Sequence, residues 1–167
     1  MIYGEELLQC LTELQPVPWS GEVYRHMFGA NPPDKENTIG ARWNPPEVPA
    51  IYASLETETA KSEADYYIEM QPLRPKAERR IYRIKISLGS VLDLRDWAVL
   101  QHLGIRKQSY ALPEPPRCKE VGGGIAHLGH DGLLVPSARA SGTNVVIFPD
   151  NKSASYEFNS VDFKIVN

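Results

Sequence analysis

Proline and glycine interrupt this chain so often that its helices and strands are expected to be short. The 167 residues include 14 prolines and 12 glycines, which gather in stretches such as QPVPWSG, GANPPDKENTIG and NPPEVP. Proline lacks a backbone N–H and has a fixed φ, so it ends helices and is poorly tolerated in the middle of a sheet. The sequence therefore predicts many turns between a few helices and several short strands.

The composition fits one globular domain over residues 1–167. Hydrophobic residues make up 42% of the chain, and no repeat or linker divides it. The net charge of −3 lacks the basic surface that nucleic-acid binding requires, so no direct binding to nucleic acid is expected. No apolar run approaches the roughly 20 residues that span a bilayer, and the first residues do not resemble a secretory signal. We expect a cytoplasmic protein with no membrane partner.

Hydrophobic periodicity predicts an α+β fold, a single domain of short, mostly antiparallel strands with a few helices. Helices are expected over about residues 4–15 and 56–69, and a short one is expected over residues 95–104. Residues 105–131 show little periodicity and are expected to be irregular, with VGGGI as a flexible turn. Strands are expected over residues 22–28, 40–44, 50–54, 81–88, 90–94, 132–138, 144–148 and 161–166, the second and third of these forming a hairpin.

An acidic side chain interrupts the apolar stripe of the helix over residues 56–69. Ala60, Ala64, Tyr67 and Ile68 recur at helical spacing, and Glu63 lies inside this stripe. Carboxylates are almost never fully buried unless they are paired. Glu63 is therefore expected to face a polar cleft and act there; the alternative is a slightly rotated helix with Glu63 at its wet margin.

Two arginines are candidates for binding an anion. Arg25 lies on the strand face shared with Val23 and Met27, so it can point inward, and a structural ion pair is the alternative. Arg42 lies in the ARWN stretch, where an exposed strand arginine is the alternative. A guanidinium offers five fixed donors and binds phosphate oxygens in pairs, so an arginine that faces a cleft suits a phosphate ligand.

Three further polar residues lie near strand ends. Tyr52 can stack on a flat heterocycle or simply belong to the core. Ser137 follows a proline at the end of a buried strand, without the Gly-x-Ser-x-Gly pattern of an acyl-transfer nucleophile. Asn144 opens the next strand and can either hydrogen-bond a ligand or cap the turn.

Other reactive side chains give no metal or disulfide pattern. His127 and His130 lie three residues apart with no third ligand at suitable spacing, so no metal site is expected. Cys10, on a predicted helix, and Cys118, in a predicted loop, form neither a metal motif nor a disulfide framework. Both are expected to be buried or idle thiols.

Taken in order, the stretches VYRHMF, GARWNPP, AIYAS, AKSEADYY and LLVPSARASGTN resemble the RES domain, which is named for its Arg, Glu and Ser. The resemblance runs from about Tyr24 to Asn144 and is expected to continue to the end of the chain. It implies a fold akin to ADP-ribosyltransferases of the diphtheria-toxin kind. It also implies a toxin of a bacterial toxin–antitoxin pair, partnered by an antitoxin with an Xre-like helix-turn-helix.

The resemblance further implies attack on NAD with release of nicotinamide, so NAD is a substrate and no cofactor is expected. The products would arise by hydrolysis or phosphorolysis; alternatives are ADP-ribosylation of a protein and a non-catalytic ligand-binding module. The polar set that matches the family comprises Arg25, Arg42, Tyr52, Glu63 and Ser137, and Asn144 matches a common position.

The roles follow from the charges that NAD cleavage involves. Glu63, Arg25 and Ser137 are the expected catalytic residues, with Glu63 opposing the positive charge that grows on the ribose. Arg25 and Arg42 are expected to bind the pyrophosphate, and Tyr52 to stack on the nicotinamide ring. Ser137 would orient the carboxamide or Glu63, and Asn144 would contact the substrate.

Overall fold

The computed structural model describes residues 2–113 and 115–167. The domain expected over residues 1–167 therefore includes two positions, 1 and 114, that lie outside the described residues. The elements run in the order α1 (Glu5–Thr12), β1 (Val17–Phe28), β2 (Ile51–Ser54), α2 (Thr57–Glu69), β3 (Arg79–Asp93), α3 (Trp97–His102), η1 (Lys107–Ser109), α4 (Pro116–His127), β4 (Gly132–Pro136), β5 (Thr143–Ile147), η2 (Pro149–Asn151) and β6 (Glu157–Val166).

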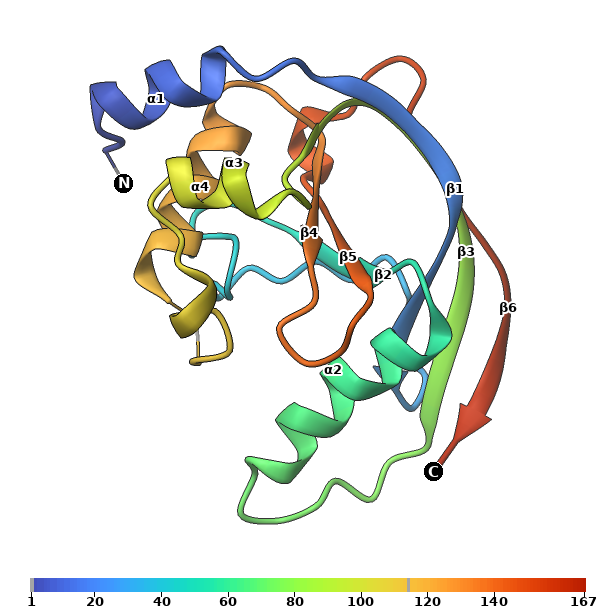
Figure 1. The fold of residues 1–167 in the computed structure, drawn as a ribbon. Helices are drawn as coiled ribbons and strands as arrows, with labels where there is room; N and C mark the ends of the chain where they lie inside the picture. The colour runs from blue at the N-terminus through green and yellow to red at the C-terminus, as the bar shows by residue number, and fades with distance from the viewer. Residues whose placement is uncertain (1, 114) are drawn as a thin grey trace.

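The six strands form one sheet that curls back on itself (Figure 1). Its order is β1-β2-β5-β4-β3-β6, and β1 also pairs along β3. Only β3 and β4 run parallel, over the three pairs from Val91–Gly132 to Asp93–Leu134, among the strand pairs described. The α+β prediction with mostly antiparallel strands is confirmed.

Three of the strands are longer than expected. β1 has 12 residues, β3 has 15 and β6 has 10, and the strands predicted over 81–88 and 90–94 are one continuous β3. Pro18 is tolerated because it lies near the start of β1, where the register with β3 shifts between Val17 and Trp19. β3 pairs with β1 on both sides of Gly89, at Leu88 and at Val91, so the strand continues through this glycine.

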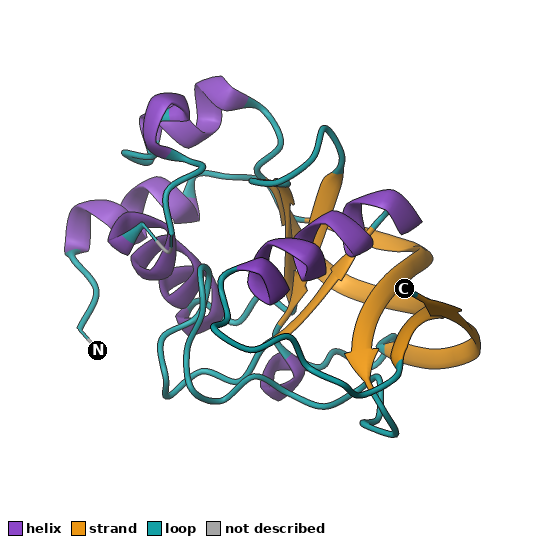
Figure 2. Ribbon diagram, turned by 90° about the horizontal axis from the view of Figure 1, so that it is seen from below, coloured by secondary structure: helices purple, strands orange, loops and turns teal. Residues whose placement is uncertain are grey.

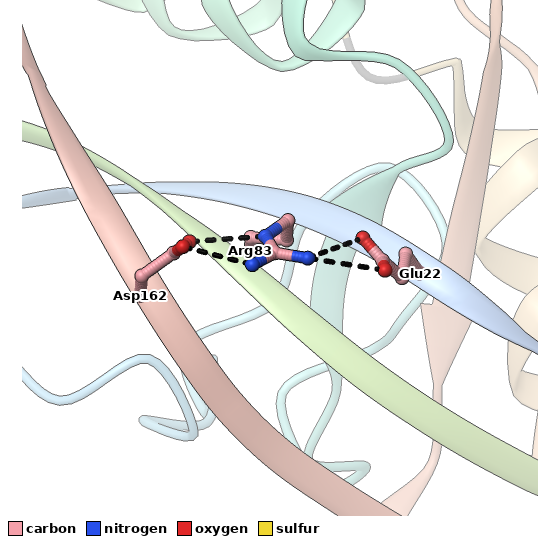
Figure 3. Close-up of polar contacts among 3 residues, drawn as sticks. All are labelled: Glu22, Arg83 and Asp162. Carbon is pink, nitrogen blue, oxygen red and sulfur yellow. Dashed lines mark hydrogen bonds and ion pairs between the residues drawn. The ribbon is translucent and has the colours of Figure 1, made fainter.

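Charged side chains join these long strands on one face of the sheet (Figure 3). Arg83 on β3 pairs with Glu22 on β1, at 3.1 Å, and with Asp162 on β6, at 2.9 Å. Exposed ion pairs add little to stability, so this trio supports the register of the three strands more than their stability.

The predicted hairpin of 40–44 with 50–54 is wrong. Residues 40–44 form a tight turn closed by an isolated bridge between Ala41 and Asn44. β2 pairs instead with β5 and, at Tyr24–Ser54, with β1. The prolines that follow Asn44 cannot donate to a ladder, so the two arms that local sequence suggested do not pair.

The irregular region predicted over 105–131 contains a 12-residue helix, α4. Its glycines 122–124 are buried in the helix and do not form a turn. A Cβ on Gly122 would lie 1.9 Å from the carbonyl oxygen of Trp43, so the helix can approach that backbone only without a side chain there. Cys118 consequently lies on α4, fully buried, and Cys10 is half-buried on α1.

The core has two parts, one on each face of the central strands. Leu133 and Val146 belong to the cluster under α1, α3 and α4, whereas Leu134 and Val145 belong to the cluster inside the curled sheet. Successive side chains of a strand point to opposite faces, so β4 and β5 are buried on both sides. This explains the apolar runs LLV in β4 and VVI in β5. The helices α1, α3 and α4 lie together beside the sheet, whereas α2 lies apart from them (Figure 1 and Figure 2). No described helix is long and apolar enough to cross a membrane.

Candidate functional site

A cavity of about 510 Å³ lies between α2, the ends of β1 and β2, and the loop that joins these two strands. Five of the six residues predicted to form a site line it: Arg25, Arg42, Tyr52, Glu63 and Asn144. The sixth, Ser137, contacts Glu63 directly. The structure therefore brings together residues separated by more than one hundred positions in the chain.

Glu63 faces this cavity from α2 and is half-buried. Its Oε1 accepts hydrogen bonds from Ser137 Oγ, at 2.7 Å, and from Asn144 Nδ2, at 2.8 Å. Its Oε2 has no hydrogen-bond partner among the described residues. Ala60 and Ala64 line the same cavity, so the small residues of the helical stripe leave room beside the carboxylate. Tyr67, expected in the core, is 48% exposed at the cavity wall.

The two donors to Glu63 are themselves held in place. Ser137 is 8% exposed, and its Oγ accepts hydrogen bonds from the backbone N–H groups of Arg139 and Ala140, both at 3.1 Å. Asn144 Oδ1 accepts from Ser54 Oγ at 2.6 Å, which directs the amide N–H group toward Glu63. Neutral, oriented donors thus fix the position of one carboxylate oxygen.

Arg25 supplies a half-buried positive charge on the cavity wall. Its Nη1 donates to the carbonyl of Pro33 at 2.6 Å. Burial lowers the pKa of Arg25 to about 10, and the charge of Asp34 partly opposes this effect, so the guanidinium stays protonated at neutral pH. Within the described residues Arg25 forms no salt bridge, so the structure does not support the ion-pair alternative.

Arg42 was expected either to bind an anion or to be an exposed strand arginine, and its position differs from both. It is 9% exposed and not on a strand, and its Nη1 and Nη2 donate to the carbonyls of Tyr110, at 2.8 Å, and Leu112, at 3.0 Å. Its guanidinium carbon also lies 5.2 Å from the centroid of the Tyr110 ring. Two of its nitrogens therefore hold a distant loop segment, and only its remaining N–H groups are left for an anion.

Tyr52 is both a core residue and part of the cavity wall. It packs against the cluster under α1, α3 and α4 and lines the cavity. Its hydroxyl donates to Asn44 Oδ1 at 2.5 Å and accepts from the backbone N–H of Trp43 at 2.9 Å. Asn44, which is fully buried, was not singled out from the sequence, although it belongs to the ARWN stretch.

His26, which lines the cavity, was also missed by sequence reasoning. Its Nε2 accepts from Arg79 Nε at 2.9 Å, and Arg79 Nη2 bonds to Asp65 on α2 at 2.7 Å. Burial, helped by the charge of Arg79, lowers the pKa of His26 to about 4. Arg25 and His26 both line the cavity although side chains alternate along a strand, so the cavity borders both faces at the end of β1. No local pattern signals this.

The two histidines examined as metal ligands make separate contacts. His127 lies beside the ring of Tyr3, with 5.5 Å between centroids, and His130 Nδ1 lies 2.7 Å from Ser90 Oγ. Across residues 2–113 and 115–167, no group of three or more His, Cys, Asp and Glu side chains is placed to hold a metal ion.

Comparison with known proteins bears on the family and the fold of the chain. The model of the RES domain family matches residues 18–163. Seven chains of solved structures match, including one in the crystal structure of the M. tuberculosis MbcT–MbcA toxin–antitoxin complex. That match has a TM-score of 0.85 and 22% sequence identity, and it covers 98% of this chain and 93% of the other. At this identity the likeness shows a shared fold. No curated protein matches.

Proposed function

The chain belongs to the RES domain family, and from this membership and the geometry of its cavity we propose that it cleaves the nicotinamide–ribose bond of NAD. The observation that carries the proposal is Glu63, an acid held by two neutral donors in the same cavity as the protonated Arg25. The volume of about 510 Å³ lies within the range of small-molecule sites, roughly 300–1,000 Å³.

The chemistry needs a negative charge next to the ribose. When the bond between the nicotinamide nitrogen and the ribose C1′ breaks, its electron pair leaves with neutral nicotinamide, and positive charge remains on the ribose. The carboxylate of Glu63 would stabilise this charge, and its second oxygen, Oε2, can accept a hydrogen bond from a ribose hydroxyl. Preorganised groups of this kind change rates by about 10²–10³-fold.

The other cavity residues would orient the dinucleotide. Arg25 has donors beyond the one used by Pro33 and would bind the pyrophosphate, the strongly anionic part of NAD. Arg42 would contribute only through its remaining N–H groups, because Tyr110 and Leu112 occupy two nitrogens. Tyr52 would stack on the nicotinamide ring from the cavity wall, and Asn144 would contact the substrate beside Glu63.

The biological role that fits is that of a toxin silenced by a partner. A match with the fold found in a toxin–antitoxin complex supports this role, and an enzyme that consumes NAD must be inhibited in its own cell. We propose an antitoxin with an Xre-like helix-turn-helix as the partner and the cytoplasm, where the NAD pool is, as the site of action. A gene for a small helix-turn-helix protein next to the gene for this chain would support the pairing.

The decisive experiment measures nicotinamide release from NAD by the purified chain, with and without phosphate, and identifies the products by mass. Glu63→Gln is expected to lower the rate about 10²–10³-fold, whereas Glu69→Gln, at an exposed position of the same helix, should leave it unchanged. A folded Glu63→Gln protein that releases nicotinamide at the wild-type rate would contradict the role of Glu63.

The products decide between the acceptors. ADP-ribose indicates water, and ADP-ribose-1″-phosphate indicates phosphate; either result supports breakdown of free NAD. Loss of NAD only in the presence of lysate, with a labelled protein band, would instead show ADP-ribosylation of a target. Tight binding of NAD without turnover would show a non-catalytic binding module.

A further inference from the structure

Two arginines hold three successive backbone carbonyls of one loop. Arg42 donates to Tyr110 O and Leu112 O, at 2.8 and 3.0 Å, and Arg139 donates to the carbonyl between them, Ala111 O, at 2.7 Å. Hydrogen bonds from a charged donor are stronger than those between neutral groups. The bonds from Arg42 and Arg139 therefore fix the loop over residues 110–112, which we call the clasped segment.

Arg139 also contacts the helix that carries Glu63. Its guanidinium carbon lies 3.4 Å from the centroid of the Tyr66 ring on α2, well within the range of a cation–π contact. Tyr66 is one helical turn after Glu63, on the same element. The position of the Arg139 side chain is thus linked to the position of the acid.

The backbone of Arg139 reaches the site by a second route. Its N–H donates to Ser137 Oγ at 3.1 Å, and the same Oγ donates to Glu63 Oε1 at 2.7 Å. Arg139 is not among the residues that line the cavity, so it would not touch the substrate. One residue therefore joins the clasped segment, α2 and the turn that carries Ser137.

We propose that Arg139 is a positioning residue for the reaction: it sets where Glu63 lies relative to Ser137 and the clasped segment. This inference rests on the proposed cleavage of NAD. Misplacement by about 1 Å in an active site can cost about 10²-fold in rate. Loss of the Arg139 side chain should therefore lower kcat more than it raises KM, because the groups that would bind the pyrophosphate are unchanged.

The test compares Arg139→Gln with Arg139→Lys in the full chain. Arg139→Gln is expected to lower kcat about 10–100-fold with KM for NAD changed less than about threefold. Arg139→Lys keeps a cation over Tyr66 and should recover part of the loss. The matched control is Arg95→Gln, since Arg95 is a surface arginine bonded to Asp93 that touches neither α2 nor the cavity.

A double-mutant cycle separates positioning from a general loss of stability. Because the side chains of Arg139 and Ser137 would both position Glu63, the combined effect of Arg139→Gln and Ser137→Ala on kcat should be smaller than the product of the single effects. Hydrogen exchange should rise in the clasped segment and in α2 of Arg139→Gln, and not in Arg95→Gln.

The outcomes distinguish this inference from the function on which it rests. Nicotinamide release by the wild type together with unchanged kcat in Arg139→Gln would overturn the positioning role alone. Multiplicative effects in the cycle, or an effect confined to KM, would also overturn it. A wild-type chain that releases no nicotinamide would overturn both proposals.

Discussion

The two side chains that donate to Glu63 are neutral. Ser137 and Asn144 donate to one of its oxygens, and no arginine or lysine among the described residues forms a salt bridge with it. A salt-bridged carboxylate would already be neutralised by its partner, and it would stabilise a developing cation less well. The arrangement holds the acid in place without a cationic partner, as the proposed role of Glu63 requires.

The lowered pKa of one residue, His26, predicts that the stability of the protein depends on pH. Its pKa in the folded chain is about 4, below the ordinary value of 6.5, so the unfolded state binds more protons between these values. The stability that the neutral His26 contributes is complete above pH 6.5 and is lost as the pH falls to 4. With allowance for partial exposure, the loss should be roughly 2 kcal/mol.

The measurement is the free energy of unfolding by urea at pH 7, 5 and 4, for the wild type and for His26→Gln. Glutamine can still accept a hydrogen bond from Arg79 but does not titrate. The wild type should lose stability faster than the variant as the pH falls. Parallel curves for the two proteins would show that His26 does not titrate as its burial indicates.

Among the elements, α4 shows how packing reverses a local preference. In an isolated helix, replacing glycine with alanine is favourable by about 0.5–1 kcal/mol. At Gly122, however, the added carbon would lie 1.9 Å from the backbone oxygen of Trp43, whereas at Gly124 the nearest atom is a leucine methyl at 3.0 Å. Backbone cannot move aside as a side chain can, so the two positions should differ.

We therefore expect Gly122→Ala to lower the free energy of unfolding by about 2–3 kcal/mol, as overpacked core sites do. Gly124→Ala, on the same helix, should change it by less than about 1 kcal/mol, because the helix preference offsets a small shift of Leu11. Thermal and urea unfolding of the two variants gives the comparison. Equal stabilities would mean that α4 is not held against Trp43 as described.

At the scale of the whole molecule, the cavity exists because the sheet curls. Pairing of β1 with both β2 and β3 closes the sheet, and α2 crosses it to cover the end of β1 (Figure 1). Arg25 on β1 and Glu63 on α2 thereby come to line one cavity, together with the loop between β1 and β2. Binding in such a cavity should stabilise all of these segments together.

This predicts a thermal shift with NAD in the inactive Glu63→Gln background. At a concentration 100-fold above Kd, a ligand that binds only the folded state adds about 2.7 kcal/mol to its stability. A second substitution, Arg25→Gln, should reduce the shift, because it removes the cation expected to bind the pyrophosphate. A full shift in the double variant would exclude Arg25 from binding, and no shift in either would argue against NAD as the ligand.

Much of the site was predictable from the sequence because short-range patterns report burial. Helical periodicity placed Glu63 on an inward stripe of α2, and the apolar runs of β4 and β5 identified strands. Periodicity of this kind depends on neighbours within a few residues, which the sequence shows directly. The other polar residues of the cavity, Arg25, Arg42, Tyr52 and Asn144, were predicted from the resemblance of the ordered motifs to the RES domain.

What each polar group bonds to was decided only by the tertiary structure. Arg42 donates to carbonyls 68 and 70 residues away, and Asn144 and Ser137 reach Glu63 across 81 and 74 residues. The same holds for the glycines of α4: Gly122 lies against the backbone of Trp43, 79 residues earlier, and Gly124 lies beside Leu11. Local sequence limits which residues are buried, but the closing of the sheet and the packing of α4 determine which distant groups meet.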